Sequence, residues 1–197
     1  MYMDDKYIYL NDKSLCGEVC DEIITKFNKS NYTPGTTSRG ININMKLTYD
    51  LVINGRTEWE EIESMLYNEL YHNIKNYIEH ITQVNSKLFA EYIPFDINEI
   101  CDDNLTFQIQ KYINNKGMFS PHHDFNIEKN QFRIFTYIWY LNDVDIGGET
   151  VFNQQIKITP KTGRLVIFPA CWTAPHQGKM PISNDKYIIT GWVYKNI

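Results

Sequence analysis

His122 and Asp124 are separated by one residue in the stretch Ser120-Pro121-His122-His123-Asp124-Phe125. If this stretch is a β-strand, His122 and Asp124 share one face and His123 takes the other, because successive strand side chains point to opposite sides. One imidazole and one carboxylate are two of the three ligands in the 2-His-1-carboxylate triad that holds non-haem Fe(II). A His-x-Asp pair alone is weak evidence, since most such pairs are surface or hydrogen-bonding residues. A metal site here therefore needs a third ligand from elsewhere in the chain.

His176 is the candidate third ligand, within Trp172-Thr173-Ala174-Pro175-His176-Gln177 on a late expected strand. A lone histidine is more often a loop residue that is hydrogen-bonded to the backbone. Lys186 weakens that alternative, because it follows ten residues later and opens the last expected strand. A dicarboxylate co-substrate needs such a cation, since a buried carboxylate is costly unless it is paired. His122, Asp124, His176 and Lys186 together predict an iron site that also takes an acidic small molecule.

The composition is that of a soluble globular protein. The chain has 197 residues, of which 43% are hydrophobic and 22% charged, so it is long enough for one domain with a full core. The net charge of -5 argues against nucleic acid as the default partner. No apolar run approaches the roughly 20 residues that span a membrane, and the acidic, polar start of the chain does not resemble a signal peptide. We therefore expect a cytoplasmic protein without a membrane segment, while the oligomeric state stays open.

The four cysteines are Cys16, Cys20, Cys101 and Cys171, too few and too scattered for a disulfide framework. Cys16 and Cys20 stand one helical turn apart and could form half of a metal site. They also fall on the apolar stripe of an expected helix, which favours small buried hydrophobic residues instead.

The first half of the chain predicts helices that cover a sheet. The strongest signal is a helix over residues 59–81, where apolar residues recur at steps of three or four. The polar stretch 28–44 predicts a long loop, and a surface excursion and a substrate lid are equally good interpretations of it. The other expected elements are an edge strand over 6–10, a helix from Asn11 or Ser14 to about Phe27, an extended segment over 45–54, and a helical piece over 86–92.

The second half predicts short strands, because apolar and polar residues alternate between turn signals. That spacing favours a sandwich or a barrel. We expect one domain, with residues 1–104 as mostly helical support and a long loop and residues 105–197 as the β core. The expected strands cover 105–113, 119–125, 132–141, 150–152, 156–158, 164–168, 173–177 and 186–194.

Further motifs accompany the candidate ligands over 105–194. In chain order the set is Tyr112, His122-His123-Asp124, Arg133 to Asn142, Gly147 to Phe152, Pro160 to Arg164, Phe168-Pro169, His176 and Lys186 to Trp192. In type and order these motifs resemble the Fe(II)- and 2-oxoglutarate-dependent dioxygenases of the prolyl hydroxylase type, in particular small prokaryotic and viral members. The first half of the chain is similar to the same members more loosely.

The resemblance implies a mainly β fold, a double-stranded β-helix (a cupin-like jelly roll) backed by α-helices. It also implies Fe(II), 2-oxoglutarate and O2 at the mouth of the jelly roll, with ascorbate as an optional addition. The residues implied for Fe(II) are His122, Asp124 and His176. The residues implied for 2-oxoglutarate are Lys186 on the far carboxylate, helped by Tyr140, with Tyr112 and Thr190 as further contacts.

The implied reaction is the hydroxylation of an unactivated C–H bond, coupled to the conversion of 2-oxoglutarate into succinate and CO2. A peptidyl residue, proline first, is the leading substrate. The alternative is a small-molecule hydroxylase that acts on a free amino acid or metabolite, since the same core serves both. A third interpretation is a non-catalytic sensor module that binds 2-oxoglutarate and iron. The presence of all three candidate ligands and of Lys186 argues against it.

Overall fold

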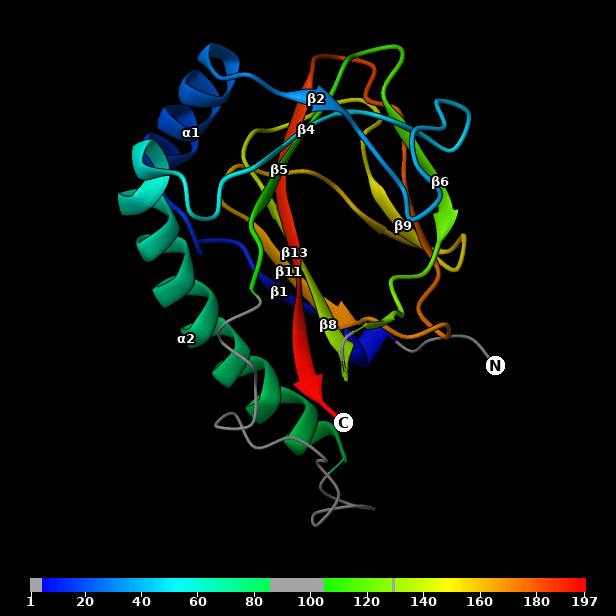
Figure 1. Ribbon diagram of the computed structural model, residues 1–197. Helices are drawn as coiled ribbons and strands as arrows, with labels where there is room; N and C mark the ends of the chain where they lie inside the picture. Colours follow the sequence, from blue (N-terminus) through cyan, green and yellow to red (C-terminus); the bar gives the residue numbers. More distant parts are fainter. Residues whose placement is uncertain (1–4, 86–104, 129) are drawn as a thin grey trace.

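The computed structural model describes residues 5–85, 105–128 and 130–197, so the helical piece predicted over 86–92 lies outside the described residues. Two antiparallel sheets form a sandwich, and two long helices lie along the outer side of the larger sheet (Figure 1). The mainly β architecture backed by helices is therefore as predicted. Among the described residues, no helix combines the length and the apolar character that a membrane crossing needs.

Within the described residues the larger sheet has eight strands. In spatial order they are β1 (Tyr9–Asn11), β11 (Leu165–Pro169), β8 (Gln131–Tyr140), β13 (Lys186–Asn196), β5 (Gln108–Tyr112), β4 (Tyr49–Val52) and β2 (Thr33–Pro34), with β7 (Ile127–Glu128) paired to β8. The smaller sheet runs β10 (Ile156–Ile158), β9 (Thr150–Phe152), β12 (His176–Gly178), β6 (Met118–His122) and β3 (Lys46–Leu47). The helices are η1 (Asp5–Tyr7), α1 (Gly17–Lys29), η2 (Thr57–Trp59) and α2 (Glu60–Asn85).

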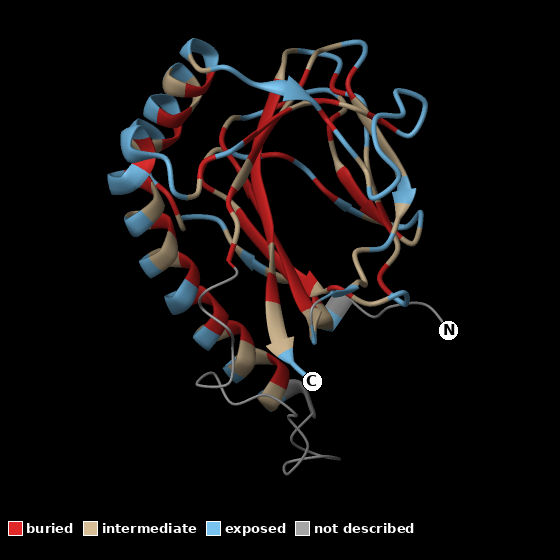
Figure 2. Cartoon of the chain, viewed as in Figure 1, coloured by how far each residue is buried: buried red, intermediate tan, exposed pale blue. Residues whose placement is uncertain are grey.

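Strand β8 separates two apolar cores by the alternation of its side chains. Phe135, Tyr137 and Trp139 pack with buried residues of α1 and α2 on one face. Ile138 and Tyr140 point to the other face and pack between the two sheets. Figure 2 shows the same division, because the sides of the helices that face the sheet are buried and their outer sides are exposed. Helices thus cover one face of the large sheet, which leaves the space between the sheets for the site.

Helix α1 begins at Gly17, later than the predicted start at Asn11 or Ser14. Ser14 does not cap the helix, because its hydroxyl accepts a hydrogen bond from Trp139 Nε1 at 2.8 Å and donates one to Glu69 at 2.8 Å. Cys16 precedes the helix and is exposed, so the predicted burial of this residue is wrong, whereas Cys20 is buried as expected.

The segment predicted to be extended over residues 45–54 is divided between the sheets. β3 pairs with β6 in the smaller sheet, and β4 pairs with β5 in the larger one. A buried ion pair spans the crossover, with Lys46 Nζ 2.6 Å from Asp50 Oδ2, and Thr48 donates to the same carboxylate. The loop predicted over 28–44 contains the short strand β2, so the prediction of a continuous loop is wrong there. Its role as a lid stays a prediction.

Ser14→Ala should destabilise the fold by about 1–3 kcal/mol, because it leaves the fully buried indole N–H of Trp139 without its acceptor. Denaturant unfolding of the two proteins measures the difference. Ser38→Ala is the matched control, since Ser38 is exposed, and its effect should stay within about 0.5 kcal/mol. Equal stabilities for Ser14→Ala and the unchanged protein would show that the Ser14 hydrogen bonds contribute nothing.

Candidate metal centre and co-substrate site

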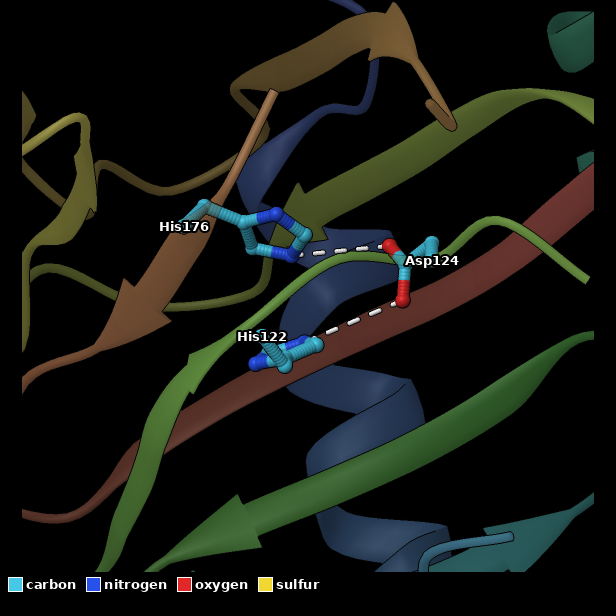
Figure 3. Close-up of side chains that lie close together, drawn as sticks. All are labelled: His122, Asp124 and His176. Atoms are coloured by element: carbon cyan, nitrogen blue, oxygen red, sulfur yellow. Dashed lines mark ion pairs between the residues drawn. The ribbon is translucent and has the colours of Figure 1, made fainter. Parts of the chain in front are cut away.

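His122, Asp124 and His176 meet at one end of the smaller sheet. β6 and β12 are antiparallel neighbours whose register sets His176 opposite His122. The candidate ligand atoms of the three residues all lie within 4.8 Å of one another. Figure 3 shows the two imidazoles and the carboxylate turned toward a common point. The structure therefore brings together the three residues that the sequence proposed as a metal triad.

Asp124 reaches this point without being part of a strand. β6 ends at His122, so strand alternation, which predicted a shared face for His122 and Asp124, does not explain their proximity. The Asp124 carboxylate instead accepts a hydrogen bond from Thr136 of β8 at 2.8 Å, and its backbone carbonyl accepts one from Arg133 at 3.3 Å. His123 is exposed, so the choice of His122 over His123 agrees with the structure although the reason differs.

Hydrogen bonds to the backbone set the tautomer of both imidazoles. His122 Nδ1 lies 2.8 Å from the carbonyl oxygen of Ser120, and His176 Nδ1 lies 3.1 Å from that of Ala174. A carbonyl oxygen can only accept, so each Nδ1 carries the hydrogen and each Nε2 presents a lone pair to the carboxylate. Such contacts of the outer ring nitrogen are the usual way in which a metal-binding histidine is oriented.

The donor set fits a divalent cation. His122 Nε2 is 3.7 Å and His176 Nε2 is 3.5 Å from the nearer oxygen of Asp124, which is too long for hydrogen bonds. Burial and the neighbouring His176 lower the pKa of His122 to about 4. Burial alone would raise the pKa of Asp124, but the two histidines and the Thr136 hydrogen bond hold it below its usual value. A neutral imidazole and a carboxylate are the forms that bind Fe(II), and two His and one Asp form its facial triad.

Two residues that the sequence reasoning missed support the triad. Thr136 orients the carboxylate, and the ring of Phe119 stacks on the His122 imidazole with 3.6 Å between the centroids. Thr136 shares the inward face of β8 with Tyr140, so strand alternation could have identified it. The sequence offers no comparable signal for Phe119, since its role depends on the rotamer of His122.

Lys186 lies between the sheets with only 1% of its side chain exposed. Its ammonium donates to the carbonyl oxygen of Gly148 at 2.9 Å and stands 3.9 Å from the centre of the Tyr112 ring. Burial lowers the pKa of Lys186 to about 7, and the charge of Glu149 opposes this shift only in part. A buried ammonium that meets a carbonyl and a ring rather than a carboxylate is suited to bind an incoming anion.

The three other predicted co-substrate residues surround the same space. Tyr112 lies opposite Lys186 in the β5–β13 pair, and its hydroxyl donates to Gln110 at 3.1 Å. The Tyr140 hydroxyl donates to Thr150 at 2.6 Å, and burial raises the pKa of both tyrosines. Thr190 shares the inward face of β13 with Lys186, but its hydroxyl donates to the carbonyl oxygen of Tyr137 at 2.9 Å. Thr190 would have to release that bond before it could donate to a ligand.

The fold and the site define a jelly-roll protein with a 2-His-1-carboxylate metal site and a buried cation in the same interior. Residues 107–194 match the family model of the 2OG-Fe(II) oxygenase superfamily. The match confirms the resemblance that the sequence motifs indicated: this segment is a 2OG-Fe(II) oxygenase domain, and such domains use Fe(II), 2-oxoglutarate and O2. Probable prolyl 4-hydroxylase 8 of Arabidopsis thaliana is 54% identical over 39 residues, which are 17% of this chain and 13% of that protein.

Solved structures of prolyl hydroxylases share the fold. A prolyl-4-hydroxylase of Pseudomonas putida superposes with a TM-score of 0.65 at 14% identity, over 97% of this chain and 93% of that one. The viral collagen prolyl hydroxylase of Paramecium Bursaria Chlorella virus-1 gives 0.61 at 18% identity, over 96% of each chain. A Trichoplax adhaerens prolyl hydroxylase, in complex with a hypoxia inducible factor peptide fragment, gives 0.71 at 20% identity, over 96% and 84%. The predicted jelly roll is therefore confirmed.

Alanine at His122, Asp124 or His176 should abolish the binding of Fe(II), because each removes one of three converging ligand atoms. Alanine at His123 should leave the affinity unchanged, since this exposed imidazole lies outside the cluster. Anaerobic titration with Fe(II), or with Co(II) as a coloured probe, measures the effect. Loss of metal in His123→Ala together with retention in His122→Ala would contradict the assignment.

Proposed function

We propose that this protein hydroxylates peptidyl proline in a reaction that depends on Fe(II), 2-oxoglutarate and O2 and releases succinate and CO2. The observation that carries the proposal is that the triad and Lys186 share one interior. Among the described residues Lys186 forms no ion pair with a carboxylate, so its charge suits a dicarboxylate co-substrate. The similar proteins with known structures are named prolyl hydroxylases, and one of them is in complex with a peptide. These names support a peptide as the substrate.

Each residue of the site has a defined role in this proposal. His122, Asp124 and His176 would hold the iron. When bound, the iron would supply the oxidising chemistry that the hydroxylation of an unactivated C–H bond needs. Lys186 pairs with the far carboxylate of 2-oxoglutarate, and Tyr140 donates a hydrogen bond to the same group after turning from Thr150. The two sheets exclude water from this space, which strengthens the charge pair.

Trp192 offers the substrate a hydrogen-bond donor in the same interior. Its side chain faces the interior opposite Thr136, and its indole N–H is buried without a hydrogen-bond partner among the described residues. The guanidinium of Arg133 lies 3.6 Å from the centre of the Trp192 ring and donates to the backbone of Asp124. A buried N–H without an acceptor is costly, and the carbonyl group of a peptide would satisfy it. We assign this contact to Trp192.

The other predictions from the sequence stay predictions. These are the cytoplasmic location, the absence of nucleic acid as a partner, the use of ascorbate, and the arrangement of the whole chain as one domain.

Mass spectrometry of peptides incubated with the Fe(II) enzyme tests the proposed function. We expect 2-oxoglutarate-dependent addition of one oxygen atom to a central proline, and none when the same position holds alanine. The matched control is His176→Ala, which should produce neither hydroxyproline nor succinate. Hydroxylation of free proline at a higher kcat/KM than any peptide would contradict the peptide assignment and favour the small-molecule alternative.

Lys186→Ala should raise the KM for 2-oxoglutarate by an equivalent of about 2–5 kcal/mol, because it leaves a buried carboxylate unpaired. Tyr140→Phe deletes one hydrogen bond and should cost about 1 kcal/mol. In the unchanged enzyme, Lys186 loses its proton as the pH rises through about 7. The affinity for the dianion should therefore fall above this pH by up to about tenfold per unit, and binding there should take up a proton.

Calorimetry in two buffers of different ionisation enthalpy measures the proton uptake, and titration at several pH values measures the affinity. Lys186→Ala serves as the control, because its weak binding should not depend on pH over the same range. A larger effect of Tyr140→Phe than of Lys186→Ala would reverse the assignment of the anchoring residue.

A further inference from the structure

Lys46 and Asp50 form a buried ion pair where the chain crosses from the smaller sheet to the larger one. Their side chains are 3% and 5% exposed, and Lys46 Nζ lies 2.6 Å from Asp50 Oδ2. The other oxygen of the carboxylate accepts a hydrogen bond from Thr48 at 2.7 Å. At Gly35 a Cβ would clash with the Thr48 hydroxyl, so the chain passes directly against this group. Protein therefore encloses the pair, and its two charges neutralise each other.

Stability alone does not account for a buried ion pair at this position. Taking two charges out of water costs free energy that their attraction often only balances, and apolar side chains that pack well in their place are frequently as stable or more so. The Lys46 ammonium has a second contact, because it lies 5.3 Å from the centre of the Phe119 ring. This distance is within the range of a cation–π interaction. Lys46 and Phe119 are also direct partners in the pairing of β3 with β6.

Phe119 in turn lies against a metal ligand. Its ring stacks on the His122 imidazole, with 3.6 Å between the centroids and 15° between the planes. Phe119 is only half-buried, so apolar packing encloses it in part, and the cation of Lys46 adds a contact that holds the ring. A continuous series of contacts therefore leads from the ion pair through Phe119 to His122.

His122 needs this support more than His176 does. The His176 side chain is 5% exposed, and its ring lies 4.8 and 5.5 Å from the rings of two phenylalanines of the core between the sheets. The His122 side chain is 18% exposed. Its hydrogen bond to the Ser120 carbonyl fixes the direction of Nδ1 but not the tilt of the ring. Stacking on Phe119 supplies the constraint on the tilt.

We propose that Lys46 is a positioning residue for the metal site. Through Phe119, the pair of Lys46 and Asp50 fixes the tilt of the His122 imidazole, so that Nε2 points to the place of the metal. The inference rests on the metal site of the proposed function and does not depend on the identity of the substrate. Residues that orient a ligand of a metal in this way contribute to metal affinity although they never touch the metal.

A double-mutant cycle on Co(II) binding to the metal-free enzyme tests this path. Lys46→Leu/Asp50→Asn removes both charges, so that neither is left buried without its partner, and should weaken Co(II) binding about tenfold. Phe119→Leu should weaken it by a similar factor. The two changes together should weaken it no more than Phe119→Leu alone, because Lys46 acts through Phe119. The visible absorption of bound Co(II), which depends on ligand geometry, should change in the same direction in these variants.

Two further variants are controls. Phe119→Tyr retains the ring and should retain the affinity and the absorption. Lys111→Leu is the matched control, because Lys111 Nζ lies 3.1 Å from Asp185 and 5.2 Å from the centre of the Tyr187 ring. This is the same arrangement of cation, carboxylate and ring, but Tyr187 packs with the helical layer instead of a metal ligand. Lys111→Leu should therefore leave Co(II) binding unchanged.

Additive losses in the cycle would refute the inference, because they would show that Lys46 does not act through Phe119. Unchanged Co(II) affinity in Lys46→Leu/Asp50→Asn would refute it too, even with a lower stability in denaturant, since the pair would then be structural only. Phe119 is half-buried, so Phe119→Leu should fold whatever the charge-free variant does, and full affinity in Phe119→Leu would also be decisive against it. An enzyme that follows the cycle but oxidises no peptide would refute the proposed function and leave Lys46 as a positioning residue.

Discussion

The antiparallel pairing of β12 with β6 is the constraint on which the site depends. It places His176 directly opposite His122, with 4.3 Å between the ring centroids, although the two residues are far apart in the chain. A slip of one residue would turn one imidazole to the other face of the sheet. β12 is held against this slip because β9 pairs with its second edge, where His176 lies opposite Phe152. At Gly178 a Cβ would lie 3.2 Å from the Tyr112 ring, so the strand that sets the register also leaves room for the ring beneath Lys186.

Two buried lysines differ in whether a carboxylate of the protein neutralises their charge. Lys46 is 3% exposed and lies 2.6 Å from Asp50, so its charge is neutralised within the protein at the crossover between the sheets. Lys186 is equally buried, but its nearest polar contact is a carbonyl oxygen, and its pKa falls to about 7. An internal ion pair needs no ligand, whereas Lys186 stays charged at neutral pH only in part until an anion arrives. This difference identifies Lys186, rather than Lys46, as the candidate anchor for the co-substrate.

The sequence was sufficient to predict the elements whose hydrophobic pattern is periodic and the site residues whose types are chemically rare. The helix signal over residues 59–81 became η2 and α2, and the strands over 150–152 and 156–158 have the predicted bounds. The start of α1 was misplaced because Ser14, a good capping residue, is hydrogen-bonded to Trp139 and Glu69 instead. Tertiary contacts of this kind override local preference. The crossover at Thr48 was also missed, since both halves of that segment alternate alike and only their partner strands differ.

Because the geometry of the metal site is fixed, the choice of substrate is left to the exposed residues beside it. β8 pairs with β11 and β13 along its length, and its two faces connect the helical layer to the site through Trp139 and Thr136. Hydrogen bonds along both edges of β8 fix its backbone, so Thr136, which orients the Asp124 carboxylate, is held in place relative to the helical layer. The iron and 2-oxoglutarate need that constancy, because they are the same in every reaction cycle. Discrimination between substrates would then fall to side chains that face solvent beside the triad, such as Trp172 in the turn before His176.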